Sequence, residues 1–326
     1  MLLLCNYYVT YKCNSSCEFC HFADHEKFST FPEASLQDFK NNVSQLARLG
    51  VKFIDLTGGE PLLNKDIAEM AGFARSLRMQ TSITTNTLLY PKYADKLAGK
   101  INLLHFSMDS PDEEEHNSIR RVKCFKSIFK SIEIAKSLGE YPDILFTATN
   151  ENFRKLPRMY EITQKYGLVL IINPVFSYFD NPGLNEEAIE YLEEFIKGKL
   201  DVYMNGAFLR LRKNGGNDIN KPRCKAVSRV IVISPDNKIV LPCYHFANKT
   251  VPIDRPLKEI RKSEELKKYM EMEGRFQFCS GCTVNCYFEP SFAFPLDIYS
   301  IQSLGSKLKY SFNKLIVQKV KKNFQN

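Results

Sequence analysis

The most constraining feature of this chain is a short cysteine loop near its N-terminus. Within residues 11–22, YKCNSSCEFCHF, three residues separate Cys13 from Cys17 and two separate Cys17 from Cys20. Three thiolates this close can bind one soft metal centre, and they leave one iron of a cubane [4Fe-4S] cluster without a protein ligand. The alternatives are redox thiols or a four-ligand zinc site completed by His21 or His25. The loop predicts a metal site, with an iron-sulfur cluster as the favoured occupant.

Composition and cysteine use indicate an ordinary globular protein in a reducing compartment. The 326 residues are 44% hydrophobic and 25% charged, and ten are cysteines. The N-terminus lacks the basic region and cleavage site of a signal peptide, and no run approaches the roughly 18 apolar residues of a spanning helix. We therefore expect a cytoplasmic protein whose cysteines are mostly ligands. Cys5 and Cys124 lie apart from the others, and we interpret them as structural.

The net charge of +8 is concentrated in the tail of the chain. Residues 307–326 contain six lysines and no acidic residue. Because no aromatic-interleaved basic platform accompanies them, we expect no nucleic-acid partner. The tail, residues 304–326, has apolar residues at helical spacing, so it can lie on an anionic membrane. The alternative is a helix docked on the fold with its lysines in water.

Apolar periodicity predicts alternating strands and helices over the first part of the chain. Strands are expected at residues 2–10, 53–57, 81–85, 103–108, 144–149 and 168–173, with helices between them. Such a series implies a parallel sheet with right-handed crossovers, in a doubly wound sheet or a partial barrel. Polar motifs follow the strand ends, where barrel-like folds place their chemistry. The expected fold class is α/β.

Composition changes between residues 181 and 216, which predicts a domain junction. Beyond it, residues 230–233 and 239–241 are expected to form a hairpin, and residues 257–272 a polar helix. We expect a barrel domain at residues 1–205, a small hairpin-plus-helix domain at 206–303 and a basic amphipathic tail at 304–326. Five cysteines lie in the second region: Cys224, Cys243, Cys279, Cys282 and Cys286.

Two motifs together resemble the radical S-adenosylmethionine (SAM) superfamily. They are the cysteine loop after the first strand and Gly58-Gly59-Glu60-Pro61 after the second. The resemblance implies a partial (β/α)6 TIM-like barrel. It also implies that Cys13, Cys17 and Cys20 hold a [4Fe-4S] cluster, and that SAM bound to the open iron is cleaved to methionine and a 5′-deoxyadenosyl radical. A reductant such as flavodoxin or ferredoxin would supply the electron.

Residues near these motifs are candidate SAM contacts. Gly58 and Gly59 allow close backbone approach, and Glu60 can accept a hydrogen bond from the SAM ammonium group. The other candidates, each equally explicable as a structural residue, are Phe19, Asn86, Ser107, Asp109 and Asn152. Arg120 and Arg121 are either partners of the SAM carboxylate or solvated residues at a helix entrance.

The C-terminal cysteines resemble the SPASM/twitch extension of the same superfamily, which binds auxiliary clusters. Five cysteines suffice for one auxiliary [4Fe-4S] cluster with one thiol to spare. Our first choice of ligands is Cys224, Cys243, Cys279 and Cys282, although Cys286 could replace either of the last two. A zinc ribbon is the alternative. Tyr244, His245 and Glu289 are candidates for the general base or hydrogen donor by position alone.

The favoured function is a radical SAM oxidoreductase or related enzyme that abstracts hydrogen from a small molecule, sugar or lipid precursor. The auxiliary cluster would assist electron transfer. A ribosomal-peptide maturase is the alternative, although the first strand begins almost at residue 1 and leaves no room for an N-terminal recognition domain. A non-catalytic zinc or nucleic-acid-binding protein would leave the Gly58–Pro61 motif unexplained.

Overall fold

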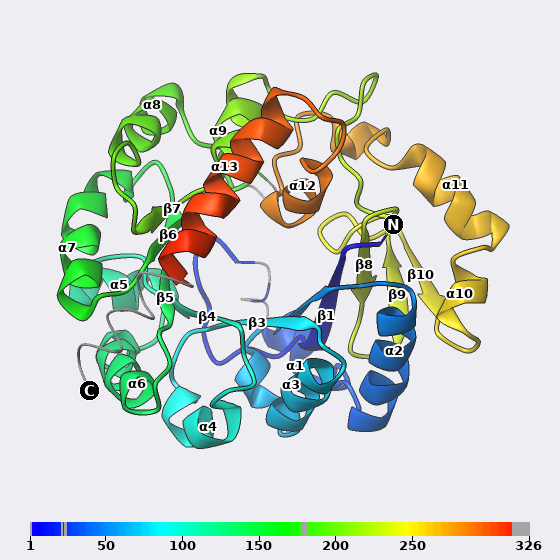
Figure 1. Ribbon diagram of the computed structural model, residues 1–326, viewed down its shortest axis with the longest axis horizontal. Coiled ribbons are helices and arrows are strands. Elements are labelled where there is room, and N and C mark those ends of the chain that lie inside the picture. Colours follow the sequence, from blue (N-terminus) through cyan, green and yellow to red (C-terminus); the bar gives the residue numbers. More distant parts are fainter. Residues whose placement is uncertain (1, 21, 23–24, 178–180, 315–326) are drawn as a thin grey trace.

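The computed structural model describes residues 2–20, 22, 25–177 and 181–314, and its centre is an open barrel of parallel strands (Figure 1). The seven barrel strands follow one another in chain order, each pairing in parallel with the next. The predicted α/β class and partial barrel are confirmed. The strands are β1 (Leu4–Thr10), β2 (Phe53–Gly58), β3 (Gln80–Thr85), β4 (Leu103–Ser107), β5 (Asp143–Ala148), β6 (Leu170–Pro174) and β7 (Val202–Tyr203).

Helices cover the outside of the barrel (Figure 1). In α2, Ser35 caps the N-terminus by accepting from the Asp38 N–H, and a buried stripe of Phe39, Val43 and Leu46 faces the sheet. The capped start and the helical spacing of the stripe explain why this segment is helical. The connecting helices are α1 (His25–Ser29), α2 (Leu36–Arg48), α3 (Ile67–Ser76), α4 (Tyr90–Leu97), α5 (Glu113–Arg120), α6 (Phe125–Ser137), α7 (Leu156–Tyr166) and α8 (Glu186–Phe195).

The two faces of the barrel strands have different chemistry. In β1, Cys5, Tyr7 and Val9 belong to the buried core beneath the helices. Because successive side chains in a strand point to opposite faces, the alternate residues Asn6 and Tyr8 face the barrel interior. The same alternation turns inward Asp55 of β2, Ser82 of β3 and His105 of β4. The interior is therefore polar, which suits a binding site.

The C-terminal strands extend the barrel sheet. β8 (Val230–Ile233) pairs in parallel with β1, while β9 (Lys238–Leu241) and β10 (Lys249–Pro252) continue antiparallel, which gives a ten-stranded sheet. The predicted hairpin over residues 230–241 forms. The predicted helix over residues 257–272 is instead two helices, because Ser263 caps a new start by accepting from the Leu266 N–H. The remaining helices here are α9 (Gly206–Lys213), α10 (Leu257–Ile260), α11 (Glu264–Met272) and α12 (Asn285–Ser291).

The helix α13 (Ile298–Phe312) runs across the open side of the barrel, close to α9 and β7 (Figure 1). The Tyr310 hydroxyl donates to Asp143 at 2.6 Å, and Lys314 Nζ lies 2.8 Å from the same carboxylate. The alternative of a docked helix placed the tail lysines in water; Lys314 departs from it, because the buried Asp143 carboxylate pairs with its ammonium group. The predicted tail beyond residue 314 lies outside the described residues. No helix in the described ranges is long and apolar enough to cross a membrane.

Candidate active site

The loop with Cys13, Cys17 and Cys20 follows β1 at the carboxyl ends of the barrel strands. Burial is the main reason that the pKa of Cys13 rises to about 12 and that of Cys20 to about 11, and the charge of Cys17 raises both further. Grouped thiols of this kind are costly to ionise without a cation, whereas a bound metal deprotonates them. The donor set therefore fits a metal centre.

Gly58 and Gly59 bring the end of β2 against the base of this loop. A Cβ atom on Gly58 would lie 1.8 Å from the Thr10 carbonyl oxygen, and one on Gly59 would lie 2.2 Å from that of Lys12. The Gly59 and Glu60 N–H groups donate to these same oxygens at 3.1 and 2.9 Å. Both glycines are thus required by contact between two chain segments, and a contact with SAM remains a prediction.

Glu60 carries a buried carboxylate, and its backbone is hydrogen-bonded to Lys12 at the start of the cysteine loop. It accepts from Leu62 N–H, Thr85 Oγ1 and Asn86 N–H at 3.1, 2.8 and 2.9 Å. Burial raises its pKa to about 7. A carboxylate has about four acceptor positions, so one further donor can bind. A cationic donor such as an ammonium group would favour the charged form, which fits the predicted role.

Asn86 follows β3 and holds the cysteine loop. Its Nδ2 donates to Asn14 Oδ1 at 2.6 Å and to Ser15 Oγ at 3.1 Å, while its Oδ1 accepts from the Leu88 N–H. These bonds tie the loop between Cys13 and Cys17 to the strand end. The structure therefore gives Asn86 a positioning function, and its predicted SAM contact is not tested.

Asp109 and Arg120 form a buried ion pair that supports the loop from the other side. Arg120 Nε donates to Asp109 Oδ2 at 2.6 Å, and Arg120 Nη1 lies 3.6 Å from Cys17 Sγ. The Arg120 guanidinium also lies 5.8 Å from the centre of the Phe19 ring. Arg120 is only 8% exposed, so the interpretation as a solvated residue is wrong. In this structure Asp109 holds Arg120 against Cys17.

Two other predicted site residues, Asn152 and Ser107, are buried near strand ends. Asn152 accepts from the Thr149 N–H at 2.8 Å and donates to the Thr147 and Asp109 carbonyl oxygens. Ser107 is the last residue of β4. Asn152 therefore shapes the turn after β5, and a cofactor contact of either residue stays a prediction.

Sequence analysis missed His116, which lies beneath the ion pair. Its Nδ1 accepts from the Asp109 N–H at 3.2 Å, which places the proton on Nε2, 3.3 Å from Cys124 Sγ. Burial, reinforced by Arg120, lowers its pKa to about 4. His116 is therefore neutral at physiological pH, and Cys124 is the buried structural thiol that was expected. A lone histidine in a helix shows no sequence pattern that would predict these contacts with Asp109 and Cys124.

A second set of cysteines meets in one enclosed pocket. Its walls include Cys224, Cys243, Cys279 and Cys282, together with Phe246. Burial raises the pKa of Cys243 to about 12 and of Cys279 to about 11, and neighbouring thiols raise both further. The structure thus brings together the four cysteines of the first choice. Cys286 is not part of this lining.

Asn217, which sequence analysis also missed, ties the segments of this pocket together. Its Nδ2 donates to the carbonyl oxygens of Gly274 and Cys279 at 2.8 and 3.1 Å, and its Oδ1 accepts from the Cys224 N–H at 3.3 Å. Beside it, a Cβ atom on Gly216 would lie 2.2 Å from the Gly281 carbonyl oxygen. The Gly-Gly-Asn sequence at 215–217 is the signal that could have been recognised.

Cys286 lies on α12 and is exposed to solvent. Its pKa is nevertheless raised to about 12, mainly by the surrounding protein and next by the charge of Asp55. Cys286 is thus reachable from solvent, and it does not line the pocket shared by the other four C-terminal cysteines.

The three candidates for the general base or hydrogen donor, Glu289, Tyr244 and His245, contact other side chains of the protein. Glu289 lies 3.0 Å from Lys307 Nζ and accepts from Asn205 Nδ2 at 2.8 Å. Tyr244 stacks on Tyr8 with ring centres 4.3 Å apart. His245 lies in the same aromatic neighbourhood, with its ring 5.6 Å from that of Tyr244. This neighbourhood joins a hydrophobic cluster that contacts both cysteine sets.

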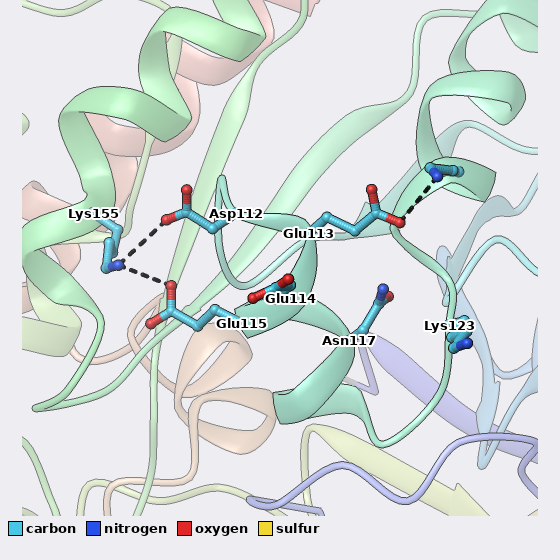
Figure 2. Close-up of a pocket in the computed structure, with 8 residues that line it drawn as sticks. Asp112, Glu113, Glu114, Glu115, Asn117, Lys123 and Lys155 are labelled. Atoms are coloured by element: carbon cyan, nitrogen blue, oxygen red, sulfur yellow. Dashed lines mark hydrogen bonds and ion pairs between the residues drawn. The ribbon is translucent and has the colours of Figure 1, made fainter.

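A surface hollow of about 890 Å³ lies around the N-terminus of α5. Figure 2 shows Lys155 between Asp112 and Glu115, at 3.4 and 2.9 Å from their carboxylates. Lys126 likewise pairs with Glu113, and no cysteine lines this hollow. We therefore assign the active site to the cysteine-lined end of the barrel.

No three histidine, cysteine, aspartate or glutamate side chains within the described ranges are grouped as ligands of a single metal ion. In a cubane each thiolate binds a different iron, so the sulfurs are farther apart than the ligands of one ion. His21, considered as a zinc ligand, lies outside the described residues, and the side chain of His25 is likewise not described.

The fold and the cysteine loop define a class of enzymes, and comparison with known proteins supports it. Residues 7–163 match the model of the Radical SAM superfamily. This match and the relatives below support the assignment of the chain to that superfamily, whose members are enzymes that bind a [4Fe-4S] cluster and SAM. At this level the predicted enzyme class, SAM and the SAM-binding [4Fe-4S] cluster are confirmed. The auxiliary cluster and the SPASM/twitch subgroup are not.

The curated relatives have different named activities. A probable GTP 3′,8-cyclase of Methanococcus maripaludis strain C7 is 27% identical over 291 residues, covering 83% of this chain and 94% of that protein. An AdoMet-dependent heme synthase of Methanosarcina barkeri is 28% identical over 167 residues, covering 49% of this chain and 47% of that protein. The relatives therefore agree on the superfamily and differ on the substrate.

Solved structures share the fold. Native anSMEcpe with bound AdoMet aligns with a TM-score of 0.64 and 17% identity, covering 98% of this chain and 100% of that one. SuiB of Streptococcus suis bound to the precursor peptide SuiA aligns with a TM-score of 0.68 and 18% identity, covering 82% and 66%. At these identities the likeness establishes the fold alone.

Proposed function

We propose that this radical SAM enzyme modifies a polar, non-phosphorylated small molecule with the help of one auxiliary [4Fe-4S] cluster. The observation that carries the proposal is the presence of two separate cysteine sets beside one polar barrel interior. Cys13, Cys17 and Cys20 would hold the SAM-binding cluster at the strand ends. The enclosed pocket with Cys224, Cys243, Cys279 and Cys282 would hold the auxiliary cluster.

The chain's own residues prepare the site for this chemistry. When bound, the first cluster and SAM supply a 5′-deoxyadenosyl radical that abstracts hydrogen from the substrate. Asn86 and Arg120 hold the cysteine loop from two sides, and Glu60 offers a buried carboxylate to the SAM ammonium group. The aromatic cluster around Tyr8 and Tyr244 excludes water from the region between the two cysteine sets.

The auxiliary cluster would exchange an electron with the substrate or with an external reductant such as flavodoxin or ferredoxin. A cluster with four protein thiolates has no open iron, which suits electron transfer better than substrate binding. The four cysteines that line the enclosed pocket support this arrangement. Cys286 would then remain free to face the substrate.

The charge of the barrel interior narrows the substrate class. Strands β1 to β7 contain no lysine or arginine, while Asp55, Ser82 and His105 face inward. Phosphate groups are usually bound by arginine, lysine or helix N-termini, so this interior disfavours a nucleoside triphosphate. Carboxylate, hydroxyl and imidazole groups suit the hydroxyl and amino groups of a sugar or amino sugar. A peptide substrate is the alternative, favoured by the likeness to peptide-bound SuiB.

Anaerobic reconstitution tests the proposal. We expect about eight irons per chain and SAM cleavage under a strong reductant. Candidate deuterated amino sugars, GTP and peptides are then compared by deuterium transfer into 5′-deoxyadenosine, and we expect transfer from the sugars. Stoichiometric zinc without SAM cleavage would refute the enzymatic proposal, and transfer from GTP or a peptide would refute the substrate class.

We also propose that α13 contacts an anionic membrane peripherally. Of the ten large apolar side chains exposed in the described ranges, seven lie between residues 294 and 312. No acidic residue follows Asp297 in the sequence, and Lys319, Lys321 and Lys322 add positive charge. Sedimentation with anionic liposomes should be weakened by Ile301→Glu with Leu304→Glu. Equal binding of the wild type and this variant would refute the contact. The seven side chains are Phe294, Leu296, Ile298, Ile301, Leu304, Leu308 and Phe312.

A further inference from the structure

Arg212 of α9 is a buried cation whose hydrogen-bond partners are all neutral. Its Nη1 and Nη2 atoms donate to five oxygen atoms, and no carboxylate of the described residues pairs with it. Its Nε is buried and has no partner among the described atoms. The five acceptors are the carbonyl oxygens of Phe208, Pro174, Val175 and Thr283, at 3.2, 3.1, 3.1 and 3.4 Å, and Asn285 Oδ1 at 3.1 Å.

This environment leaves a permanent charge uncompensated. Arginine remains protonated in proteins, and carbonyl oxygens replace its hydration without supplying a negative charge. Burial of such a charge is unfavourable unless an anion lies close. The contrast with Arg120 is clear, because Arg120 has the Asp109 carboxylate at 2.6 Å. Arg212 therefore calls for an anion that the acidic side chains of the described residues do not provide.

The group that can supply this anion is Cys282. Arg212 Nη2 donates at 3.4 Å to the carbonyl oxygen of Thr283, the residue between Cys282 and Val284, which both line the enclosed cysteine pocket. The charges of Cys282 and Arg212 accordingly act on each other. A [4Fe-4S] cluster with four thiolates carries a net negative charge, which grows by one when the cluster is reduced.

We infer that Arg212 compensates the charge of the auxiliary cluster and raises its reduction potential. This inference rests on the auxiliary cluster proposed above. Reduction adds one electron to the cluster, and the fixed positive charge of Arg212 favours the more negative, reduced state. Its unpartnered Nε–H is a further donor that suits a charged sulfur acceptor. Arg212 is thus a positioning and tuning residue for this site.

A redox titration of the full-length holoprotein tests the inference. In a Cys13→Ala, Cys17→Ala, Cys20→Ala background the auxiliary cluster is the one left to titrate, and electron paramagnetic resonance reports its reduced fraction. At a fixed solution potential, Arg212→Gln should lower the ratio of reduced to oxidised cluster about tenfold. For one electron this corresponds to a fall of about 59 mV in the reduction potential of the cluster. Arg212→Lys keeps the charge and should stay near the background value.

Arg210→Gln is the matched control. Arg210 lies on the same helix, and its Nε bonds to Gln302 at 2.7 Å. Its loss should leave the potential unchanged. An unchanged potential in Arg212→Gln with the cluster retained overturns the inference, as does an equal shift in Arg212→Lys. If Arg212→Gln loses the cluster, the reduction potential of Arg212→Lys decides. A potential equal to that of the triple-alanine background supports the inference, and a lower potential overturns it.

Failure of the underlying proposal is a distinct result. If no auxiliary cluster exists, the triple-alanine background shows no iron and no titratable signal before any change at Arg212, and both ideas fall together. If that background holds about four irons, the auxiliary cluster stands whatever the arginine variants show. Urea unfolding of the apoproteins separates a loss of charge from a loss of fold.

Discussion

The two cysteine sites are built in different ways. Cys13, Cys17 and Cys20 occupy one short loop, and the side chains of Asn86, which follows β3, and Arg120 of α5 hold it in place. The second set comes from segments far apart in sequence, held together by hydrogen bonds of Asn217. Two of the three loop cysteines are half-buried, whereas the second set lines an enclosed pocket. The difference suits an open, SAM-binding cluster in the first site and a closed electron carrier in the second.

The two sites also differ in the positive charge beside them, and this difference suits the same division of roles. At the first, Arg120 is already neutralised by Asp109, so little positive charge is left for a cluster. At the second, no carboxylate within the described ranges pairs with Arg212. A cluster beside an uncompensated cation is easier to reduce. We therefore expect the second site to have the higher reduction potential and to act as the electron acceptor of the pair.

The largest expected effect separates the two sites by function. Cys17→Ala should reduce SAM cleavage at least about 1,000-fold and remove about four of about eight irons, because the SAM-binding cluster is lost. Cys282→Ala should also remove about four irons but leave reductive SAM cleavage measurable. Iron counting and chromatography of 5′-deoxyadenosine check both variants. If Cys282→Ala abolishes SAM cleavage while the first cluster remains, the two sites are not independent.

Glycine substitutions should break each site separately. Gly59→Ala places a Cβ atom 2.2 Å from the Lys12 carbonyl oxygen, and Gly216→Ala does the same against Gly281. Because both obstacles are backbone atoms, we expect each to lower the free energy of unfolding by about 3 kcal/mol. Gly305→Ala in α13 meets open space and should raise it by about 0.5 to 1 kcal/mol. Urea unfolding measures all three, and equal losses in all would contradict this account.

Acid should weaken the first site before the second. His116 is neutral in the folded protein, with a pKa lowered by burial from 6.5 to about 4. Between these values the unfolded chain binds a proton that the folded chain does not. Stability therefore falls as pH falls from 6.5 to 4, by at most about 3 kcal/mol. Burial raises the pKa values of Cys243 and Cys279, so these thiols do not titrate in this window.

The variant His116→Gln isolates this contribution. Glutamine has no group that titrates between pH 4 and 7, so the slope of the unfolding free energy against pH should become shallower by about one proton in that range. The measurement is urea unfolding of the apoprotein at several pH values. Parallel curves for the wild type and His116→Gln would mean that His116 is not the acid-sensitive group.

Features carried by contiguous motifs or regular periods could be predicted from the sequence. The loop from Cys13 to Cys20, the six main strands and the hairpin over residues 230–241 are of this kind. Features that depend on pairing between distant segments could not. Nothing in the local pattern shows that β8 pairs with β1, or that Asn217 joins the loops of the second site.

Helix α13 shows what an amphipathic pattern leaves open. The spacing of Leu304, Leu308 and Phe312 predicts an apolar face that meets either a membrane or the fold, and in the structure these side chains are exposed. Lys307 and Lys314 instead turn toward Glu289 and Asp143. Periodicity marks a face but does not reveal what it meets. Here the half-buried Glu289 of α12 and the buried Asp143 of β5 pair with lysines that the pattern alone would leave in water.

The smallest expected effect concerns Cys286, the thiol that sequence alone could not exclude from the ligand set. It is exposed and does not line the pocket that Cys282 lines. Cys286→Ser should therefore keep all of about eight irons and normal SAM cleavage, whereas Cys282→Ser should lose about four irons. Any change in Cys286→Ser should appear in substrate turnover alone. Loss of iron from Cys286→Ser would instead place Cys286 among the ligands, and the pocket would then have to open to admit it.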